Sequence, residues 1–310
     1  MRALLSCLPI RDLGRQIGGR RHRCGDPRVP GPGVNGGGAI LLAGPVLLIG
    51  VGRMGAALLK GWIANGISPI IAVDPKPSPE LKALAKKHRV TLLGDVSDVP
   101  KARIAACIVA LKPQVLKDAA PHLRAVAESG ALMISIAAGT TTRSLVKAWG
   151  PKARVVRSMP NTPGAIGRGI TAIYATSKAD AKDRALAERL LSALGETVWV
   201  KKEGLIDAAT AVSGSGPAYV FLLVEAMTQA GIAEGLPRDV AAKLARQTVS
   251  GAGALLDAEK IPPADLRRNV TSPGGTTEAA LKVLMAGDGL AALMRRAVKA
   301  ARERADELGR

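Results

Sequence analysis

A glycine-rich turn early in the chain is the first group of residues whose spacing suggests chemistry. An apolar run, Val46 to Ile49, leads directly into Gly50, Gly52 and Gly55 and then into a helical pattern. Gly50 permits a tight turn, Gly52 lets the backbone approach a pyrophosphate, and Gly55 lets the helix lie near the strand. The N-terminus of that helix would face the phosphates. The sequence of strand, turn and helix therefore predicts a dinucleotide site.

Asp74 stands at the end of the second apolar run and bears on which nucleotide binds. A carboxylate there accepts hydrogen bonds from the ribose hydroxyls of NADH and repels the extra phosphate of NADPH. Lys76 and Ser78 follow immediately and can hold that phosphate. The residues leave both nucleotides open. They also leave open that the segment from Asp74 to Pro77 forms only a solvated turn.

Four further loops are candidates for ligand binding, three of them after apolar runs and one in the C-terminal half. Three of them, 110–113, 135–139 and 159–163, fall where strands of a parallel sheet would end, which is the edge that binds ligands. The segment 269–277 carries a run of small residues before a helical pattern, and its amides and hydroxyls suit a carboxylate. Helix capping by Thr276 or Thr277 is the competing interpretation.

Composition narrows the classes of function. The 310-residue chain has a formal charge of +19, which suits phosphate-bearing partners, whether a polymer or a small cofactor. Only three Trp, two Tyr and one Phe are present, so there are few platforms on which single-stranded bases could stack. Three cysteines without CxxC spacing and three histidines argue against a zinc site. Cys107 lies in an apolar run and is interpreted as a small buried hydrophobe in a reduced protein.

The elements needed to position these loops follow an alternating pattern up to about residue 202. Apolar runs separated by helical stretches predict an α/β fold with a parallel sheet and helices on both faces. The expected strands are 46–49, 70–73, 90–93, 104–110, 131–136, 154–158, 169–175 and 197–200. The helical stretches include 54–64, 80–87, 115–127 and 179–194.

After residue 202 only helical patterns remain. They cover 204–212, 217–233, 237–258, 263–269, 276–286 and 288–308. The segment 218–227 is apolar almost all round, with Glu225 as its only charge. Such a helix is buried on every side. Because about 108 residues can hardly surround it, the sequence predicts a second subunit packed against it.

Residues 1–44 differ from the rest of the chain. They hold seven Arg, two Asp and no Lys, with a Gly/Pro-rich stretch at 25–38. We interpret this segment as disordered, either a targeting-like extension or the result of a start codon read too far upstream. The apolar run 39–51 is interrupted by Gly44 and Pro45 and is shorter than the roughly 20 residues of a spanning helix, so a buried strand is expected instead.

Taken in order, the motifs resemble those of the pyrroline-5-carboxylate reductases. The resemblance runs from about residue 46 to 308 and leaves out the segment 1–44. It implies a Rossmann domain at 45–202 followed by a helical substrate and dimerisation domain at 203–310. The quoted motifs are Gly50-Val-Gly-Arg-Met-Gly55, Ala110-Leu-Lys-Pro113, Ile136-Ala-Ala-Gly-Thr140, Met159-Pro-Asn-Thr-Pro163, Ser213-Gly-Ser-Gly-Pro-Ala-Tyr219, Gly235-Leu-Pro-Arg238 and Thr271-Ser-Pro-Gly-Gly-Thr-Thr277.

The resemblance also implies roles for individual residues. Asp74 with Lys76 would hold the adenosine ribose, and the Thr277 hydroxyl would hydrogen-bond the ring nitrogen of the substrate. The pyrophosphate would lie against Gly50, Val51, Gly52, Arg53 and Met54. The nicotinamide side would be lined by Ala110, Leu111, Lys112, Pro113, Ala137 and Ala138. The substrate would contact Glu203, Asn269, Val270, Ser272, Gly275 and Thr276. The chain departs from the family pattern at Asp74, where NADPH-preferring members commonly carry a small polar residue, and by one extra residue within 259–265.

The implied reaction is reduction of 1-pyrroline-5-carboxylate to L-proline, the last step of proline synthesis. A protonated cyclic imine is electrophilic, so hydride transfer needs orientation more than a strong acid, and the lack of His beyond residue 122 fits this. We expect NADPH as cofactor, with NADH as the second choice, no metal, and a cytoplasmic homodimer that can assemble into a ring. Neither nucleic acid nor membrane is an expected partner.

Two other classes stay open on the sequence alone. A β-hydroxyacid dehydrogenase shares the two-domain plan and would use a helix lysine as acid and base, for which Lys243 is the candidate. A non-catalytic dinucleotide sensor, or a nucleic-acid binder that uses the positive charge, is the second class.

Overall fold

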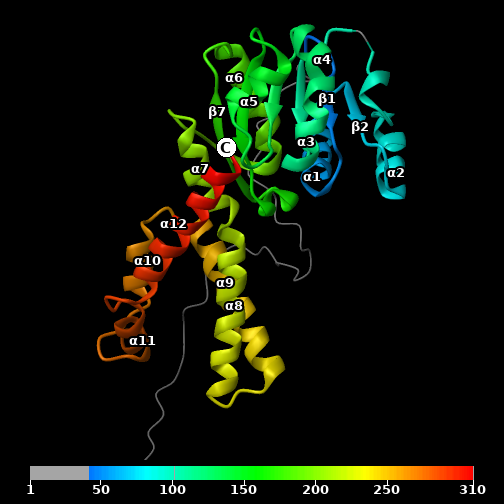
Figure 1. The fold of residues 1–310 in the computed structure, drawn as a ribbon. Helices are drawn as coiled ribbons and strands as arrows, with labels where there is room; N and C mark the ends of the chain where they lie inside the picture. The colour runs from blue at the N-terminus through cyan, green and yellow to red at the C-terminus, as the bar shows by residue number, and fades with distance from the viewer. Residues whose placement is uncertain (1–41, 101, 310) are drawn as a thin grey trace, which may run out of the picture. The chain divides into compact units, whose positions relative to one another are not determined.

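The computed structural model describes residues 42–100 and 102–309. An eight-stranded sheet with the order β3-β2-β1-β4-β5-β6-β7-β8 forms the N-terminal half (Figure 1). β2 pairs with one side of β1 and β4 pairs with its other side. The strand order therefore reverses at β1: the chain adds β2 and β3 on one side of it, and β4 and the later strands on the other. The strands are β1 (Val46–Ile49), β2 (Ile70–Val73), β3 (Thr91–Leu93), β4 (Ala106–Val109), β5 (Leu132–Ser135), β6 (Arg154–Met159), β7 (Gly169–Ala175) and β8 (Gly195–Trp199).

The expectation of a wholly parallel sheet is wrong at one strand pair, so β7 and β8 run opposite to the other six strands. β7 runs antiparallel to β6, with Ser158 opposite Ile173, whereas all the other pairs are parallel. The connection between the two strands holds only the short 3₁₀ helix Thr162–Ile166. A parallel crossover needs a dozen or more residues, usually including an α-helix, and this connection is too short for one.

Helices cover both faces of the sheet. In β1, Val46 and Leu48 face a core that includes Trp62 of α1, while Leu47 and Ile49 face a second core. This burial on both faces is what the continuous apolar runs predicted. The expected helix 115–127 is instead three pieces around Pro121. The helices of this half are α1 (Arg53–Ala64), α2 (Pro79–His88), α3 (Pro113–Ala119), α4 (Arg124–Glu128), α5 (Thr142–Trp149) and α6 (Ala181–Leu191), and the 3₁₀ helix Ala120–Leu123 joins α3 to α4.

From residue 203 onward the described residues form only helices. α7 (Gly204–Ala209) continues through a π-helical turn, Thr210–Gly214, which leads into α8 (Gly216–Ala233). α8 packs along α9 (Arg238–Ala258), and α12 (Leu290–Leu308) packs against α7 and the π-helical turn. Between them lie α10 (Pro263–Asn269) and α11 (Thr276–Leu284).

The helical half has very little core of its own. No residue of α8 is buried within the chain, and Phe221 and Leu222 are 61% and 62% exposed. Complete burial of α8 was expected, and a single chain does not provide it. The cover that such an apolar helix requires must therefore come from outside this chain.

The predicted disordered extension, 1–44, lies almost entirely outside the described residues. Of the three described positions in it, Leu42 already packs against the sheet core. Among the described helices, none combines the length and the apolar character needed to span a membrane.

Candidate active site

The glycine turn after β1 is shaped by two close approaches. Gly50 has φ +87°, and a Cβ there would lie 2.7 Å from Leu111 Cδ2 and 2.9 Å from the Ala110 carbonyl oxygen. A Cβ on Gly55 would lie 2.1 Å from the carbonyl oxygen of Gly50. Only glycine fits at these two positions, which confirms the tight turn and the close helix predicted from the sequence.

Gly52 differs from its two neighbours in the motif. A Cβ on Gly52 would meet no atom within 4 Å, so the space beside it is open. Gly52 is also the N-cap of α1, and no side chain caps that helix. The leading amides of α1 are therefore accessible to a ligand, and the residues present fit a dinucleotide pyrophosphate. Arg53 is exposed beside them and adds positive charge.

Asp74 is tied to the glycine turn. Its Oδ2 accepts a hydrogen bond from the Val51 N–H at 3.1 Å, and its Oδ1 accepts one from the Lys76 N–H at 2.9 Å. The alternative of a merely solvated turn does not describe this carboxylate, which links the ends of β1 and β2. Lys76 is exposed, and the Ser78 hydroxyl caps α2 by accepting the Leu81 N–H at 3.2 Å.

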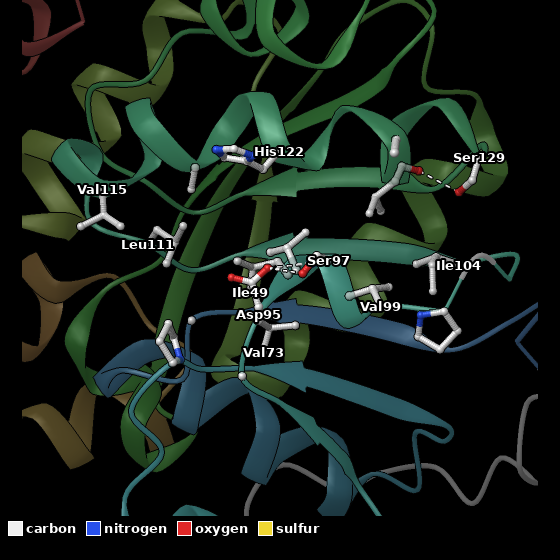
Figure 2. Close-up of a pocket in the computed structure, with 18 of the residues that line it drawn as sticks. Ile49, Val73, Asp95, Ser97, Val99, Ile104, Leu111, Val115, His122 and Ser129 are labelled. Carbon is white, nitrogen blue, oxygen red and sulfur yellow. Dashed lines mark hydrogen bonds between the residues drawn. The ribbon is translucent and has the colours of Figure 1, made fainter.

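A cavity of about 720 Å³ opens at the same edge of the sheet (Figure 2). Gly50, Pro75 and Leu111 line it at the carboxyl ends of the strands, and its far part reaches Ile104, which precedes β4. Its walls are largely apolar. Asp95 lies in it and accepts hydrogen bonds from the backbone N–H and hydroxyl of Ser97. These bonds lower the pKa of Asp95, with a smaller contribution from the nearby His122.

The two loops expected beside the nicotinamide follow adjacent strands. Ala110 to Pro113 follows β4, with Lys112 as the N-cap of α3, and Ala137 and Ala138 follow β5. The N–H of Ala137 donates to the hydroxyl of Ser135, the last residue of β5, at 3.3 Å. Both loops thus lie at the same edge as the glycine turn, on the β4 side of β1.

The expected substrate loop starts at the end of α10 and runs into α11. Asn269 is the last residue of α10, and Val270 and Ser272 are exposed. Gly275 is the N-cap of α11 and no side chain caps it, so neither Thr276 nor Thr277 is the cap that the competing interpretation required. The side chain of Glu278 instead accepts the N–H of Gly274 at 2.6 Å.

Within one chain the two halves of the site are not brought together. α10 and α11 pack against no element of the sheet half beyond isolated contacts, so the substrate loop does not face the glycine turn through packing of the described residues. Glu203, the remaining expected substrate residue, lies at the junction of the halves. Both of its carboxylate oxygens already accept hydrogen bonds from Thr142.

Sequence reasoning missed the residues that make this junction. Arg157 of β6 is 1% exposed and pairs with Glu203 and Asp207. A charged residue inside an otherwise apolar strand was the available signal. The motif 213–219 spans the end of the π-helical turn and the start of α8, and a Cβ on Gly214 would lie 2.8 Å from Met159 Cε, which places the motifs 159–163 and 213–219 against each other.

Comparisons with known proteins agree with this architecture. A family model described as pyrroline-5-carboxylate reductase dimerisation matches residues 203–308, and one described as NADP oxidoreductase, coenzyme F420-dependent, matches residues 45–139. The pyrroline-5-carboxylate reductase of Pseudomonas aeruginosa is 41% identical over 266 residues, 85% of this chain and 96% of that protein. The chain belongs to the pyrroline-5-carboxylate reductase family.

Solved structures of pyrroline-5-carboxylate reductases share this fold over most of the chain. The pyrroline-5-carboxylate reductase of Coxiella burnetii has a TM-score of 0.79 and 36% identity, and covers 86% of this chain and 98% of its own. The Plasmodium falciparum pyrroline carboxylate reductase with NADP bound has a TM-score of 0.72 and 27% identity, and covers 87% of this chain and 100% of its own.

Membership of the pyrroline-5-carboxylate reductase family decides between the open classes. The chain is an oxidoreductase that uses a nicotinamide cofactor, so the sensor and nucleic-acid alternatives are set aside. The same membership excludes a β-hydroxyacid dehydrogenase, and Lys243, the candidate acid and base for that class, is an exposed residue of α9.

Cys107 is fully buried in β4, and burial raises the pKa of its thiol, as expected for an inert small hydrophobe.

Proposed function

We infer that this chain catalyses the NAD(P)H-dependent reduction of 1-pyrroline-5-carboxylate to L-proline. The observation that carries the inference is the open glycine turn together with the substrate-loop sequence and its family match over 203–308. In the reaction, the C=N carbon gains a hydride and the ring nitrogen keeps a proton, giving the saturated ring. The nicotinamide, when bound, supplies that hydride.

The sheet half holds and orients the cofactor in this proposal. The α1 amides and Arg53 bind the pyrophosphate, and the adenine enters the cavity beside Pro75 and Leu111. The nicotinamide lies over the loops after β4 and β5, because the two mononucleotide halves of a Rossmann fold lie on either side of the reversal beside β1.

The substrate loop binds the imine. The uncapped amides at the start of α11, at Thr276 and Thr277, bind the carboxylate of the substrate, and the Thr277 hydroxyl hydrogen-bonds the ring nitrogen or relays a proton to it. Gly274 has φ +70°, and its N–H already donates to the Glu278 carboxylate, so this turn presents a backbone amide to an anionic group. Asn269, the last residue of α10, and Val270, its C-cap, form the start of the loop and contact the substrate.

A second copy of the chain completes each site. The apolar face of α8 is exposed in a single chain. The helices on either side of the substrate loop, α10 and α11, do not pack against the sheet half that carries the glycine turn of the same chain, beyond isolated contacts. We therefore propose that the loop 269–277 of one subunit faces the cofactor of its partner. Apolar residues left exposed on α11 and α12, such as Val283 and Leu293, support a further assembly of dimers into a ring.

NADPH is the proposed cofactor. The exposed Lys76, the Ser78 hydroxyl and the N-terminus of α2 offer a positive charge and hydrogen-bond donors that suit the 2′-phosphate, although Glu80 adds a negative charge in the first turn of α2. The relative from Plasmodium falciparum was solved with NADP bound. Both carboxylate oxygens of Asp74 accept hydrogen bonds from backbone amides, which orients the negative charge toward the glycine turn.

We propose the cytoplasm as the compartment, which suits the free thiol of Cys107.

Steady-state kinetics with both nucleotides and pyrroline-5-carboxylate test the activity itself. Appearance of L-proline with oxidation of NADPH is expected, and its absence with both nucleotides would refute the proposed function.

A heterodimer tests the shared site. Gly52→Leu places a side chain where the pyrophosphate is proposed to bind, at a position where a Cβ meets no atom of the chain within 4 Å, and Thr277→Ala removes the hydroxyl. If the sites are shared, a heterodimer of these two inactive variants contains one intact site and one doubly altered site, and should keep about half of the wild-type turnover per dimer. If each chain builds its own site, both sites are damaged and the heterodimer should be as inactive as its parents.

A further inference from the structure

Thr142 joins the loop after β5 to the helical half of the chain. Thr142 is the first residue of α5 and the last residue of the segment 137–142, which we call the loop 137–142. Its backbone N–H donates to Glu203 Oε1 and its hydroxyl donates to Glu203 Oε2, each at 2.6 Å. Thr142 is 8% exposed, so these bonds to a carboxylate are sheltered from water and correspondingly strong.

Arg157 fixes the carboxylate that holds Thr142. Its side chain is 2% exposed, and Nη1 lies 3.1 Å from Glu203 Oε1 while Nη2 pairs with Asp207. A buried guanidinium is strongly destabilising unless it is paired, so β6 and α7 are held in one relative position. The Glu203 carboxylate thus has three donors from the sheet half and little freedom to move toward a substrate.

The end of α12 contacts the same loop independently. Gly139 has φ +65°, and a Cβ there would lie 2.8 Å from Leu308 Cβ. At Gly309, a Cβ would lie 3.6 Å from the methyl group of Thr141. The loop 137–142 is therefore held at one end by Glu203 and against the last turn of α12 at its middle.

We propose that Glu203 is a positioning residue that acts through Thr142 to fix the loop 137–142, and that it does not bind the substrate directly. The inference rests on the proposed function, because the loop matters to catalysis only if the nicotinamide lies on it. Arg157 and Asp207 hold Glu203 in place, and misplacing the loop misaligns the hydride donor with the imine carbon. Hydride transfer depends steeply on that alignment.

The two alternatives for Glu203 differ in which kinetic constant they move. Glu203→Gln keeps the shape of the side chain but removes the charge that binds Thr142 and Arg157. A positioning role predicts a lower kcat with a nearly unchanged KM for pyrroline-5-carboxylate. A substrate-binding role predicts the reverse, a raised KM at nearly unchanged kcat, and that result would overturn the proposal.

Thr142 provides a sharper test with a conservative rescue. Thr142→Val removes only the hydroxyl and should lower kcat roughly tenfold, within the 10²-fold loss that a small misplacement can cause. Thr142→Ser keeps the hydroxyl and should retain most of kcat. The deuterium isotope effect on kcat with C4-deuterated NADPH should rise in the Val variant, because hydride transfer becomes slower than the other steps. Binding of 2′-phospho-ADP-ribose, which lacks the nicotinamide, should be unchanged in titration calorimetry.

Arg154→Met is the matched control. Arg154 lies at the opposite end of β6 and pairs with the buried Asp183, so the variant loses an ion pair on the same strand without touching the loop. It should lower the melting temperature and leave kcat and the isotope effect at wild-type values. A Thr142→Val enzyme with wild-type kcat and isotope effect, or an Arg154→Met enzyme with the same losses as Thr142→Val, would overturn the proposal. A wild-type enzyme without turnover would instead refute the proposed function.

Discussion

The Oδ2 of Asp74 accepts a hydrogen bond from the backbone N–H of Val51 at 3.1 Å, which joins the end of β2 to the glycine turn after β1. The carboxylate expected to choose between NADH and NADPH therefore also supports the turn proposed to hold the pyrophosphate. A substitution at Asp74 changes two properties at once, its charge and its role as an acceptor, and variants are needed that separate them.

Asp74→Asn and Asp74→Ala separate these properties. The Asn variant keeps one acceptor, for the Val51 N–H, but loses the acceptor of the Lys76 N–H and the charge expected to repel a 2′-phosphate, so the KM for NADPH should fall and the KM for NADH should rise. The ratio should change by about tenfold, equivalent to about 1.4 kcal/mol. The Ala variant also loses the acceptor and should raise the KM for both nucleotides relative to Asn. Equal ratios in all three enzymes, measured by steady-state kinetics, would show that Asp74 does not face the ribose.

Thr277→Ala should reduce kcat by roughly 10²-fold, the low end for a positioned proton-transfer group, and leave the NADPH dissociation constant unchanged. Thr277→Ser should keep most of the activity because it keeps the hydroxyl. Because Gly275, rather than Thr277, is the N-cap of α11, the Ala variant should melt close to the wild-type temperature. An early-melting Ala variant with wild-type turnover would require withdrawal of the catalytic role.

Phe221→Glu should convert the assembly to monomers and abolish turnover. Phe221 is 61% exposed on α8, and covering it in a dimer removes apolar surface from water, whereas a carboxylate there would be buried against apolar residues. Light scattering after size-exclusion chromatography gives the mass. Val198→Glu is the control, since Val198 is 45% exposed on the edge strand β8 and should leave mass and turnover unchanged. A dimeric, active Phe221→Glu protein would place the interface elsewhere.

A chain that begins at residue 39 should keep its catalytic constants and its oligomer size. Residues 1–38 show a biased composition without helical or strand periodicity, and they lie outside the resemblance to the reductases. Leu42 must stay, because it packs against the core. Kinetics and light scattering on the truncated protein check this, and aggregation or lost activity would contradict it.

The sequence alone determined much of this protein because the relevant signals are local. Runs buried on both faces are apolar almost throughout, so β1, β2, β4 and β5, which are buried at every position, could be located from hydropathy. Gly50 and Gly55 could be assigned because their spacing between a strand and a helix is typical of a tight turn and a close helix, and the structure has φ +87° at Gly50 and no room for a Cβ at Gly55. The helical half could be separated at residue 203 because the strand pattern stops there.

Tertiary structure alone decided how residues distant in the chain share their bonds. Asp74 could be placed at the end of β2, but that its oxygens meet the Val51 amide depends on how β1 and β2 lie side by side. Glu203 was expected at the substrate, and only the packing of α7 on β6 shows its carboxylate taken up by Thr142 and Arg157. Such contacts depend on three-dimensional proximity across many residues, which composition, periodicity and spacing do not encode.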